Sequence, residues 1–313
     1  MTTEAIAPGD LGIRVHGLGH VYKSGTRALD GIDLEIQPGL FGLLGPNGAG
    51  KSTLMRILCT LLVPTSGQAQ VAGRDVVRDR ASVRKLLGYL PQEFGGWRLQ
   101  RVGETLDTLA RLSGLCDRHA RRKRVEEVLV SVGLDQVADR KVKKLSGGMV
   151  RRLGVAQALV HDPPILIVDE PTVGLDPQER IRFRDLMAGL SRSRVIVLST
   201  HIVSDLGTAC RDLALIDSGK LVYRGAPEGL VKQARGRVFE TVIAVDGEAR
   251  LPQGIELVSR RPEGVGLRVR GVSASGALPP GADVVEDPTL EEAYLAFMAA
   301  RGRAISEIAG EEA

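Results

Sequence analysis

Apolar residues along this chain follow two different periodicities. Continuous apolar runs, which are typical of parallel strands buried on both faces, occur at Leu40–Leu44, Ile165–Asp169 and Val195–Thr200. Apolar positions spaced every three to four residues, which predict amphipathic helices, occur at 102–113, 120–132 and 150–160. Because buried strands alternate with helical segments, we predict an α/β fold with a helix-rich insertion.

Weaker patterns flank this framework. Short strands are predicted at Ile13–Val15 and Leu34–Ile36. Later in the chain, Leu213–Asp217 and Lys220–Arg224 flank Ser218-Gly219, which predicts a hairpin turn.

Beyond about residue 236 the apolar runs become short and are separated by loops rich in Gly and Pro. Strands are predicted at 238–245, 255–258 and 267–270. Thr289, followed three residues later by Glu292, predicts the capped start of a final amphipathic helix. We therefore expect a small C-terminal α/β accessory domain. The expected organisation is a flexible tail at 1–10, a main domain at 11–230 with a helical subdomain at about 95–160, the accessory domain at 236–301, and a flexible tail at 302–313.

The composition is that of an ordinary globular protein. Of the 313 residues, 43% are hydrophobic and 26% are charged. No apolar run approaches the roughly 18 residues that span a bilayer, and no secretion signal is expected in the first ten residues. The three cysteines match no metal-ligand spacing, which favours a reducing cytosol.

The net charge is +4, and basic residues cluster at 118–124 and 140–144. A solvated helical face explains such a run, and contact with anionic lipid headgroups or nucleic acid are the alternatives. Aromatic residues are few and do not interleave with the basic run, so we expect no nucleic-acid partner.

The strongest chemical signal follows the first buried run. It is a complete phosphate-binding loop (P-loop), Gly45-Pro46-Asn47-Gly48-Ala49-Gly50-Lys51-Ser52-Thr53. Glycines allow main-chain N–H groups to surround phosphate oxygens at a helix N-terminus. Lys51 is expected to reach the β- and γ-phosphates and Ser52 to bind Mg²⁺, so the motif indicates a nucleoside triphosphate.

Further motifs follow in a fixed order. They are Leu90-Pro91-Gln92-Glu93, Leu145-Ser146-Gly147-Gly148-Met149, Ile165-Leu166-Ile167-Val168-Asp169-Glu170, Gly174-Leu175-Asp176-Pro177 and Leu198-Ser199-Thr200-His201. This set resembles the nucleotide-binding domain of ABC (ATP-binding cassette) ATPases, closely over about 11–230. Within that superfamily the chain resembles the ATPase subunits of the bacterial drug-efflux (ABC-2 type exporter) branch.

Two adjacent carboxylates end a buried strand beside the P-loop. Asp169 is expected to hold Mg²⁺ directly or through water, although a plain strand-end Asp is the simpler alternative. Glu170 is expected to be the general base for the attacking water, or else only an electrostatic neighbour. The resemblance further implies that His201 contacts the γ-phosphate and water, and that Gln92 senses Mg²⁺ and links the ATP site to the helical subdomain.

Other site residues are implied by the resemblance. Ser146, Gly147 and Gly148 would read simply as a helix start, but in this family they bind the γ-phosphate of ATP held by a second subunit. This implies a head-to-tail homodimer, with Asp176 at the same interface. Tyr22 matches the residue that stacks on adenine, and Met149 departs from the usual Gln of the signature motif.

Trp97 is the only tryptophan of the chain. It is either a buried core residue or an exposed anchor for a membrane partner. We favour the anchor, in a segment that receives a short cytoplasmic helix of a permease.

These observations predict an ATPase subunit at the cytoplasmic face of the plasma membrane, which powers a separate permease. Export of a drug, lipid or other hydrophobic or polymeric compound is expected, and an importer or a soluble non-transport ABC ATPase are the alternatives. The cofactors are ATP and Mg²⁺. The sequence identifies neither the cargo nor the role of the accessory domain, for which dimer support is our first hypothesis.

Overall fold

A six-stranded sheet forms the centre of the molecule in the computed structural model, which describes residues 11–93, 98–244 and 251–303. Its strand order is β10-β9-β3-β8-β7-β6. All neighbours are parallel except β9 and β10, which form the predicted hairpin. The strands are β3 (Gly39–Leu44), β6 (Leu87–Leu90), β7 (Ile165–Asp169), β8 (Val195–Thr200), β9 (Cys210–Asp217) and β10 (Lys220–Gly225). The predicted α/β fold is confirmed.

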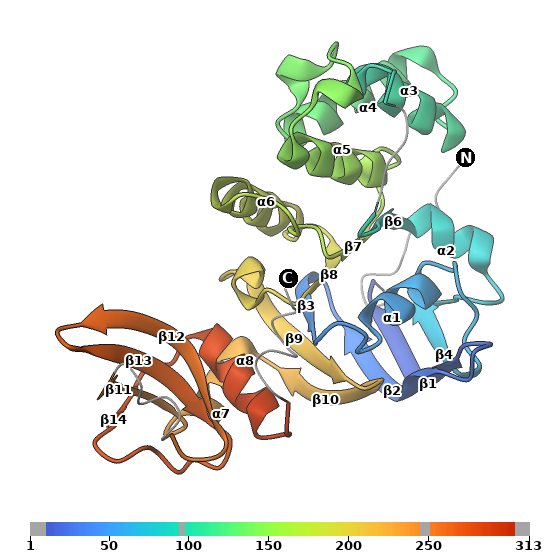
Figure 1. The fold of residues 1–313 in the computed structure, drawn as a ribbon. Coiled ribbons are helices and arrows are strands. Elements are labelled where there is room, and N and C mark those ends of the chain that lie inside the picture. The colour runs from blue at the N-terminus through green and yellow to red at the C-terminus, as the bar shows by residue number, and fades with distance from the viewer. Residues whose placement is uncertain (1–10, 94–97, 245–250, 304–313) are drawn as a thin grey trace.

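A second, antiparallel sheet with the order β2-β1-β4-β5 packs beside the first (Figure 1). Its strands are β1 (Ile13–Val21), β2 (Arg27–Ile36), β4 (Ser66–Val71) and β5 (Arg74–Asp75). The helix α1 (Lys51–Leu58) contacts both sheets. The first two strands are longer than predicted, because irregular pairing after Val15 breaks the alternation of apolar and polar residues without ending the strand.

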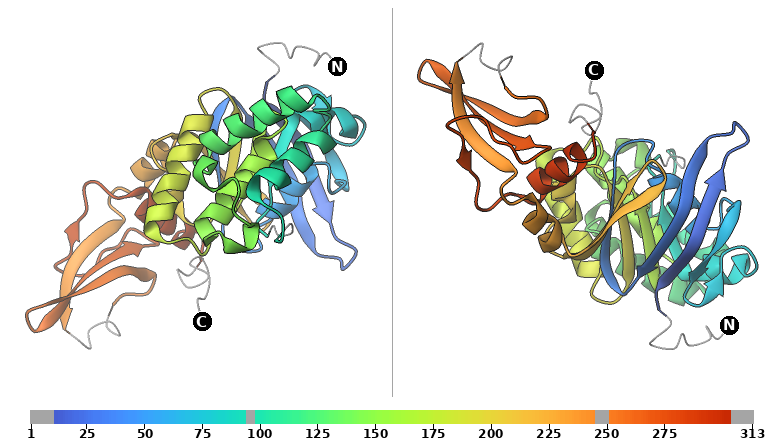
Figure 2. Two further views of the ribbon diagram at one scale, coloured as in Figure 1. Left: turned by 90° about the horizontal axis from the view of Figure 1, so that it is seen from above. Right: turned by 90° about the horizontal axis from the view of Figure 1, so that it is seen from below.

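Helices cover one face of the central sheet, as the view from above shows (Figure 2). The three helices α3, α4 and α5 pack against one another. Their bounds lie within three residues of the predicted segments. The helix α6 was not predicted from the sequence. The helices are α2 (Arg80–Leu86), α3 (Val102–Leu112), α4 (Arg118–Ser131), α5 (Gly147–Leu159) and α6 (Pro177–Leu190). Within the described residues, no helix is long and apolar enough to cross a membrane.

The basic run on α4 is partly used inside the fold. Arg121 pairs with Asp107 at 2.6 Å and donates to two carbonyl oxygens that follow α3. Arg124 donates to the carbonyl oxygens of Leu159 and Val160 at the end of α5. Cations at the C-terminal ends of helices are favourable, so these two arginines hold the helical subdomain together.

The C-terminal part contains a four-stranded sheet, β12-β13-β11-β14, that is antiparallel throughout. It lies at one end of the molecule (Figures 1 and 2). Thr289 and Glu292 form the predicted capping box of α8. The elements are α7 (Pro227–Ala234), β11 (Val238–Ala244), β12 (Ile255–Glu263), β13 (Gly266–Ser273), β14 (Asp283–Val284) and α8 (Leu290–Ala299).

The C-terminal part shares its hydrophobic core with the rest of the chain. Tyr294 of α8 and Leu230 of α7 belong to one buried cluster with Leu206, which follows β8. The sequence pattern suggested a small appendage, but α8 packs directly against segments that approach the predicted ATP site.

Candidate functional site

The P-loop connects β3 to α1 at the end of the central sheet. Gly45 has a φ of 152°, and a Cβ at this position would lie 2.2 Å from the carbonyl oxygen of Ile216. Gly50 has a φ of 110°, and its Cβ would lie 2.4 Å from the carbonyl oxygen of Ala28. Only glycine fits either position. The N-terminus of α1 has no side-chain cap, which leaves its N–H groups available to an anion.

A cleft of about 520 Å³ opens above this loop. Most of the ATP-site residues predicted from the sequence line this cleft. The cleft is lined by Tyr22, Thr26, Arg27, Ala28, Asn47, Gly48, Ala49, Gly50, Lys51, Ser52, Thr53, Gln92, Glu170, Val173 and His201.

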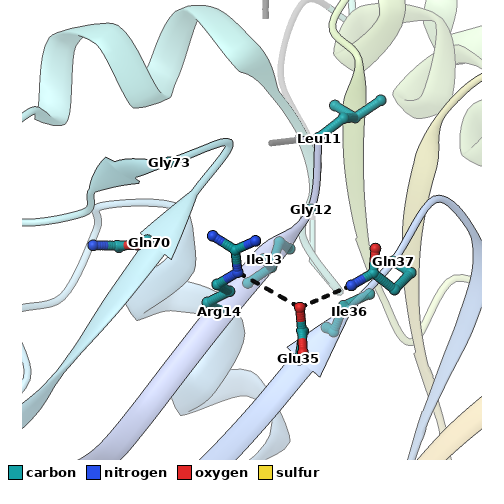
Figure 3. Close-up of a pocket in the computed structure, with 9 residues that line it drawn as sticks. All are labelled: Leu11, Gly12, Ile13, Arg14, Glu35, Ile36, Gln37, Gln70 and Gly73. Carbon is teal, nitrogen blue, oxygen red and sulfur yellow. Dashed lines mark hydrogen bonds and ion pairs between the residues drawn. The ribbon is translucent and has the colours of Figure 1, made fainter. Parts of the chain in front are cut away.

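Another indentation lies between β1, β2 and β4 (Figure 3) and has a volume of about 10 Å³. Its Glu35 is 3.5 Å from Arg14 and accepts a hydrogen bond from Gln37. Because these polar groups satisfy one another in so small a space, the indentation is not a ligand site.

Three charged or polar groups converge on the floor of the larger cleft. The Glu170 carboxylate lies 3.3 Å from Lys51 Nζ and 2.6 Å from His201 Nδ1. Lys51 also donates to the carbonyl oxygens of Gly45 and Pro46, at 2.6 and 3.2 Å. The side chains of Lys51 and Glu170 are each 5% exposed. These contacts fix the carboxylate and the ammonium in one orientation.

The main chain of Glu170 is held by Ser199, and electrostatic contacts of its side chain favour the ionised carboxylate. The φ of Glu170 is 47°, and its N–H donates to the hydroxyl and carbonyl oxygens of Ser199. Burial raises the pKa of Glu170, but the hydrogen bond from His201 and the charge of Lys51 outweigh it, so the pKa lies below its ordinary value. An ionised carboxylate can accept a proton from water.

Asp169 lies one residue earlier, at the end of β7. Its side chain is buried, and Oδ1 accepts a hydrogen bond from the Ser199 hydroxyl at 2.5 Å. Asp169 is not among the residues that line the cleft surface. Ser199, which was not selected from the sequence, therefore holds the carboxylate of Asp169 and the main chain of Glu170. Its place two residues before His201 was the available signal.

Tyr22 also lines the cleft. Its hydroxyl is 3.0 Å from the Thr53 hydroxyl, and its ring meets the His20 ring edge-on with centroids 4.7 Å apart. These two contacts hold the aromatic ring at the mouth of the P-loop.

Gln92 connects the cleft to the helical subdomain. Its carbonyl oxygen accepts a hydrogen bond from Arg151 of α5 at 2.5 Å. Sequence reasoning missed Arg151, because an arginine on a helix surface gives no signal of a main-chain contact 59 positions away. Trp97, the predicted anchor, lies outside the described residues.

Comparison with known proteins identifies the family. The chain is 40% identical over 210 residues to the Nod factor export ATP-binding protein I of Cupriavidus metallidurans, which covers 66% of this chain and 69% of that protein. The chain belongs to the ABC transporter family. The sequence model of the family described as "ABC transporter" matches residues 29–173 of this chain. This ABC chain is also 38% identical over 226 residues to the daunorubicin/doxorubicin resistance ATP-binding protein DrrA of Streptomyces peucetius, covering 72% of this chain and 68% of that one.

Solved structures place the fold in the same group. The structure of cbiO1 from Clostridium perfringens, described as part of the ABC transporter complex cbiONQ, is 27% identical with a TM-score of 0.63, and the match covers 71% of this chain and 90% of that chain. The dimeric ATP-binding cassette MJ0796, in a post-hydrolysis state with ADP and Pi, is 25% identical with a TM-score of 0.62 over 68% of this chain and 98% of its own. This ABC chain is an ATPase subunit with an ATP-binding domain.

The signature residues of the ABC chain lie outside the cleft. Ser146 and Gly147 are exposed, and Ser146 caps α5 by accepting the Met149 N–H at 3.3 Å. Gly148 is buried against α6, where a Cβ would lie 2.2 Å from Glu179 Oε2. Ser146 therefore acts as a helix cap in the single chain. Within one chain, the signature motif does not line the cleft above the P-loop.

Two further positions bear on the signature region. Asp176 is exposed and caps α6, accepting the Glu179 N–H at 2.9 Å. Met149 is partly buried and packs against the hydrophobic core. An unbranched apolar side chain suits this environment, which explains how the departure from the usual Gln is accommodated.

The donor groups fit a magnesium nucleotide. Among the residues that the structure describes, no group of three or more His, Cys, Asp and Glu is placed to hold a metal ion. Mg²⁺ is commonly held through only one or two carboxylates and completes its shell with phosphate oxygens, water and other oxygen donors. The hydroxyl of Ser52 and the amide of Gln92 in the cleft, with Asp169 behind them, match that requirement.

Proposed function

We propose that this chain powers a membrane exporter by binding and hydrolysing MgATP in the cleft above the P-loop. The observation that carries the proposal is the buried group of Lys51, Glu170 and His201 within that cleft. It combines a cation for phosphate with an ionised base, both in fixed positions.

Each side chain has a distinct proposed role. Lys51 and the P-loop N–H groups bind the β- and γ-phosphates. Tyr22 stacks on adenine. Glu170 accepts a proton from the attacking water, while His201 orients Glu170 and approaches the γ-phosphate. When bound, Mg²⁺ would neutralise part of the phosphate charge. Ser52, Asp169 and Gln92 would hold the ion.

We further propose that two copies associate head to tail. Ser146, Gly147 and Asp176 are exposed, so a second chain can reach them. Ser146 and Gly147 also lie at the start of a helix whose N-terminus attracts anions. In a dimer, this helix start from one copy would complete the phosphate site of the other. The relative MJ0796 is described as dimeric, which supports this arrangement.

The proposed transport partner is a separate permease. A groove of about 520 Å³ lies between β6 and the helical subdomain, and it is lined by Gly88, Tyr89, Leu90, Pro91, Glu93, Leu109, Ser113, Gly154, Gln157, Ala158 and His161. Glu93 directly follows Gln92, so an occupant of the groove lies next to the ATP cleft. Leu112 beside it is 75% exposed. We propose that a short cytoplasmic helix of the permease binds here and keeps the subunit at the cytoplasmic face of the membrane.

Two relatives support export rather than import. Their names describe Nod factor export and daunorubicin/doxorubicin resistance. We therefore propose a drug, lipid or other hydrophobic or polymeric compound as cargo. We also propose that residues 236–301 form an accessory unit beside the cassette at 11–230, which supports the dimer.

A Glu170→Gln variant tests this function. In MgATP, light scattering is expected to show dimers, and in MgADP monomers; the Glu126→Gln variant, which changes an exposed carboxylate, should show no lasting dimer. The tagged variant, solubilised from membranes in ATP, should retain a stoichiometric permease. A stable dimer without a membrane partner would instead support a non-transport ABC ATPase, and a monomer in ATP would contradict the proposed site.

A further inference from the structure

The last described residue, Arg303, reaches back to the hairpin between β9 and β10. Its guanidinium donates to both carboxylate oxygens of Asp217, with distances of 2.7 Å to Oδ1 and 3.4 Å to Oδ2, and also to the Ser218 hydroxyl. The Asp217 side chain is only 10% exposed. A two-point contact between arginine and a carboxylate fixes orientation as well as distance, so this pair is more than a surface contact.

The end of α8 directs Arg303 to this position. Gly302 has a φ of 80°, which glycine adopts readily. The Arg303 N–H donates to the carbonyl oxygen of Met298 at 3.1 Å, and the Gly302 N–H donates to that of Ala299 at 2.9 Å. These bonds close the last turn of the helix and hold the chain that leads to Arg303.

The hairpin that Arg303 binds also supports the P-loop. The Gly219 N–H donates to the carbonyl oxygen of Ala49 at 2.9 Å. The carbonyl oxygen of Ile216 approaches Gly45 so closely that no Cβ would fit between them. Asp217 and Ser218 lie between these two contacts. A shift of the hairpin would therefore move the P-loop main chain at two points.

A second contact joins α8 to the other side of the ATP cleft. Tyr294 is 1% exposed and packs in the same core as Val203 and Leu206, which belong to the 3₁₀ helix that follows His201. Burial and the negative charges of Asp217 and Glu170 raise the pKa of Tyr294. The ring therefore lies in the electrostatic neighbourhood of both the hairpin and the general base.

We propose that Arg303 is a positioning residue for the ATPase reaction. The C-terminal latch, defined as Arg303, Asp217 and Ser218, holds the P-loop backbone in its phosphate-binding conformation. The proposal rests on the proposed use of the cleft for ATP. It gives the C-terminal part a direct role inside one chain, in addition to any role in the dimer.

The latch predicts a particular division between binding and chemistry. The P-loop binds phosphate and rests on the hairpin that Arg303 contacts, whereas Glu170 and His201 follow β7 and β8. Loss of the latch should therefore raise the KM for ATP and change kcat less. A tenfold change in affinity corresponds to about 1.4 kcal/mol, which is close to the contribution of a single charge-assisted hydrogen bond. Because Arg303 acts on the P-loop only through the hairpin, part of this free energy should not affect ATP binding. We therefore expect ATP affinity to fall about 3- to 10-fold.

The test compares Arg303→Ala, Arg303→Lys and the matched control Arg301→Ala in the full chain. Arg301 is exposed, and its guanidinium lies 6.0 Å from the centre of the Phe297 ring. Arg301→Ala therefore removes an arginine from the same helix end but leaves the contact with the hairpin in place. Binding of a fluorescent ATP analogue, KM and kcat are measured, with thermal unfolding as the check on folding. Arg303→Lys should be intermediate, because lysine keeps the charge but not the two-point geometry, and Arg301→Ala should match the wild type.

The outcomes separate the two proposals. If the wild type does not bind ATP in the cleft, the proposed function fails. If the wild type binds and Arg303→Ala binds equally well, or if Arg301→Ala loses as much affinity, only the latch is refuted. Should Arg303→Ala not fold, Arg303→Lys and Asp217→Asn are combined. Their effects on KM should be less than additive, because both weaken one contact, and strict additivity would refute the latch.

Discussion

Replacing Glu170 by glutamine removes one charge from the buried group with almost no change of shape. The wild-type carboxylate is 5% exposed and is held 2.6 Å from His201 Nδ1 and 3.3 Å from Lys51 Nζ. A general base contributes about 10²–10⁴-fold to the rate, and we expect Glu170→Gln to lower kcat about 10³-fold.

The same change has a second effect that depends on the nucleotide. At 3.3 Å the attraction between Lys51 and Glu170 is about 5 kcal/mol for an effective dielectric constant of about 20. Desolvation offsets much of it, and the carbonyl oxygens of Gly45 and Pro46 still accept hydrogen bonds from Lys51. The nucleotide-free variant should therefore lose about 1–3 kcal/mol of stability. ATP phosphates would again give Lys51 an anionic partner.

The assay measures phosphate release and the melting temperature with and without MgATP. ATP should raise the melting temperature of Glu170→Gln by more than that of the wild type, while turnover nearly disappears. Glu126→Gln on α4 serves as the control and should behave as the wild type. A variant that hydrolyses ATP within tenfold of the wild-type rate, or that gains less from ATP, would refute this account of the cleft.

Three further predictions concern the same site. Lys51→Ala should abolish measurable ATP binding in a fluorescence titration, because no other described ammonium group lines the cleft; binding within tenfold of the wild type would contradict this. Tyr22→Ala should weaken ATP binding by about 1–3 kcal/mol, whereas Tyr22→Phe should retain most of it, since stacking needs only the ring; equal losses would point to the bond with Thr53 instead. The lowered pKa of Glu170 places its stabilising effect above the ordinary glutamate value of 4.5, to be lost as the pH falls through the lower folded value. The melting-temperature difference between wild type and Glu170→Gln should accordingly be constant from pH 6 to 8 and shrink only in acid, and a loss near neutral pH would refute the assignment.

Much of the cassette could be predicted from its sequence because its signals are local. The bounds predicted for β7 and β8 agree with the structure, since a strand buried on both faces must be apolar along its whole length. The P-loop was equally clear, because the glycines at positions 45 and 50 have no room for a Cβ. By contrast, β1 was predicted too short, since its irregular pairing with β2 obscures the alternation.

The sequence by itself determined the family, the α/β fold and the identity of the side chains around the phosphate loop, because each depends on residue type at a fixed spacing. Only the tertiary structure decided which of them meet. It joined Lys51, Glu170 and His201 in one cleft, left Ser146 exposed outside it, and brought Arg303 to Asp217 across 86 positions of the chain. Long-range contacts of this kind arise from packing and strand order, which leave no periodic signal in the residues that make them.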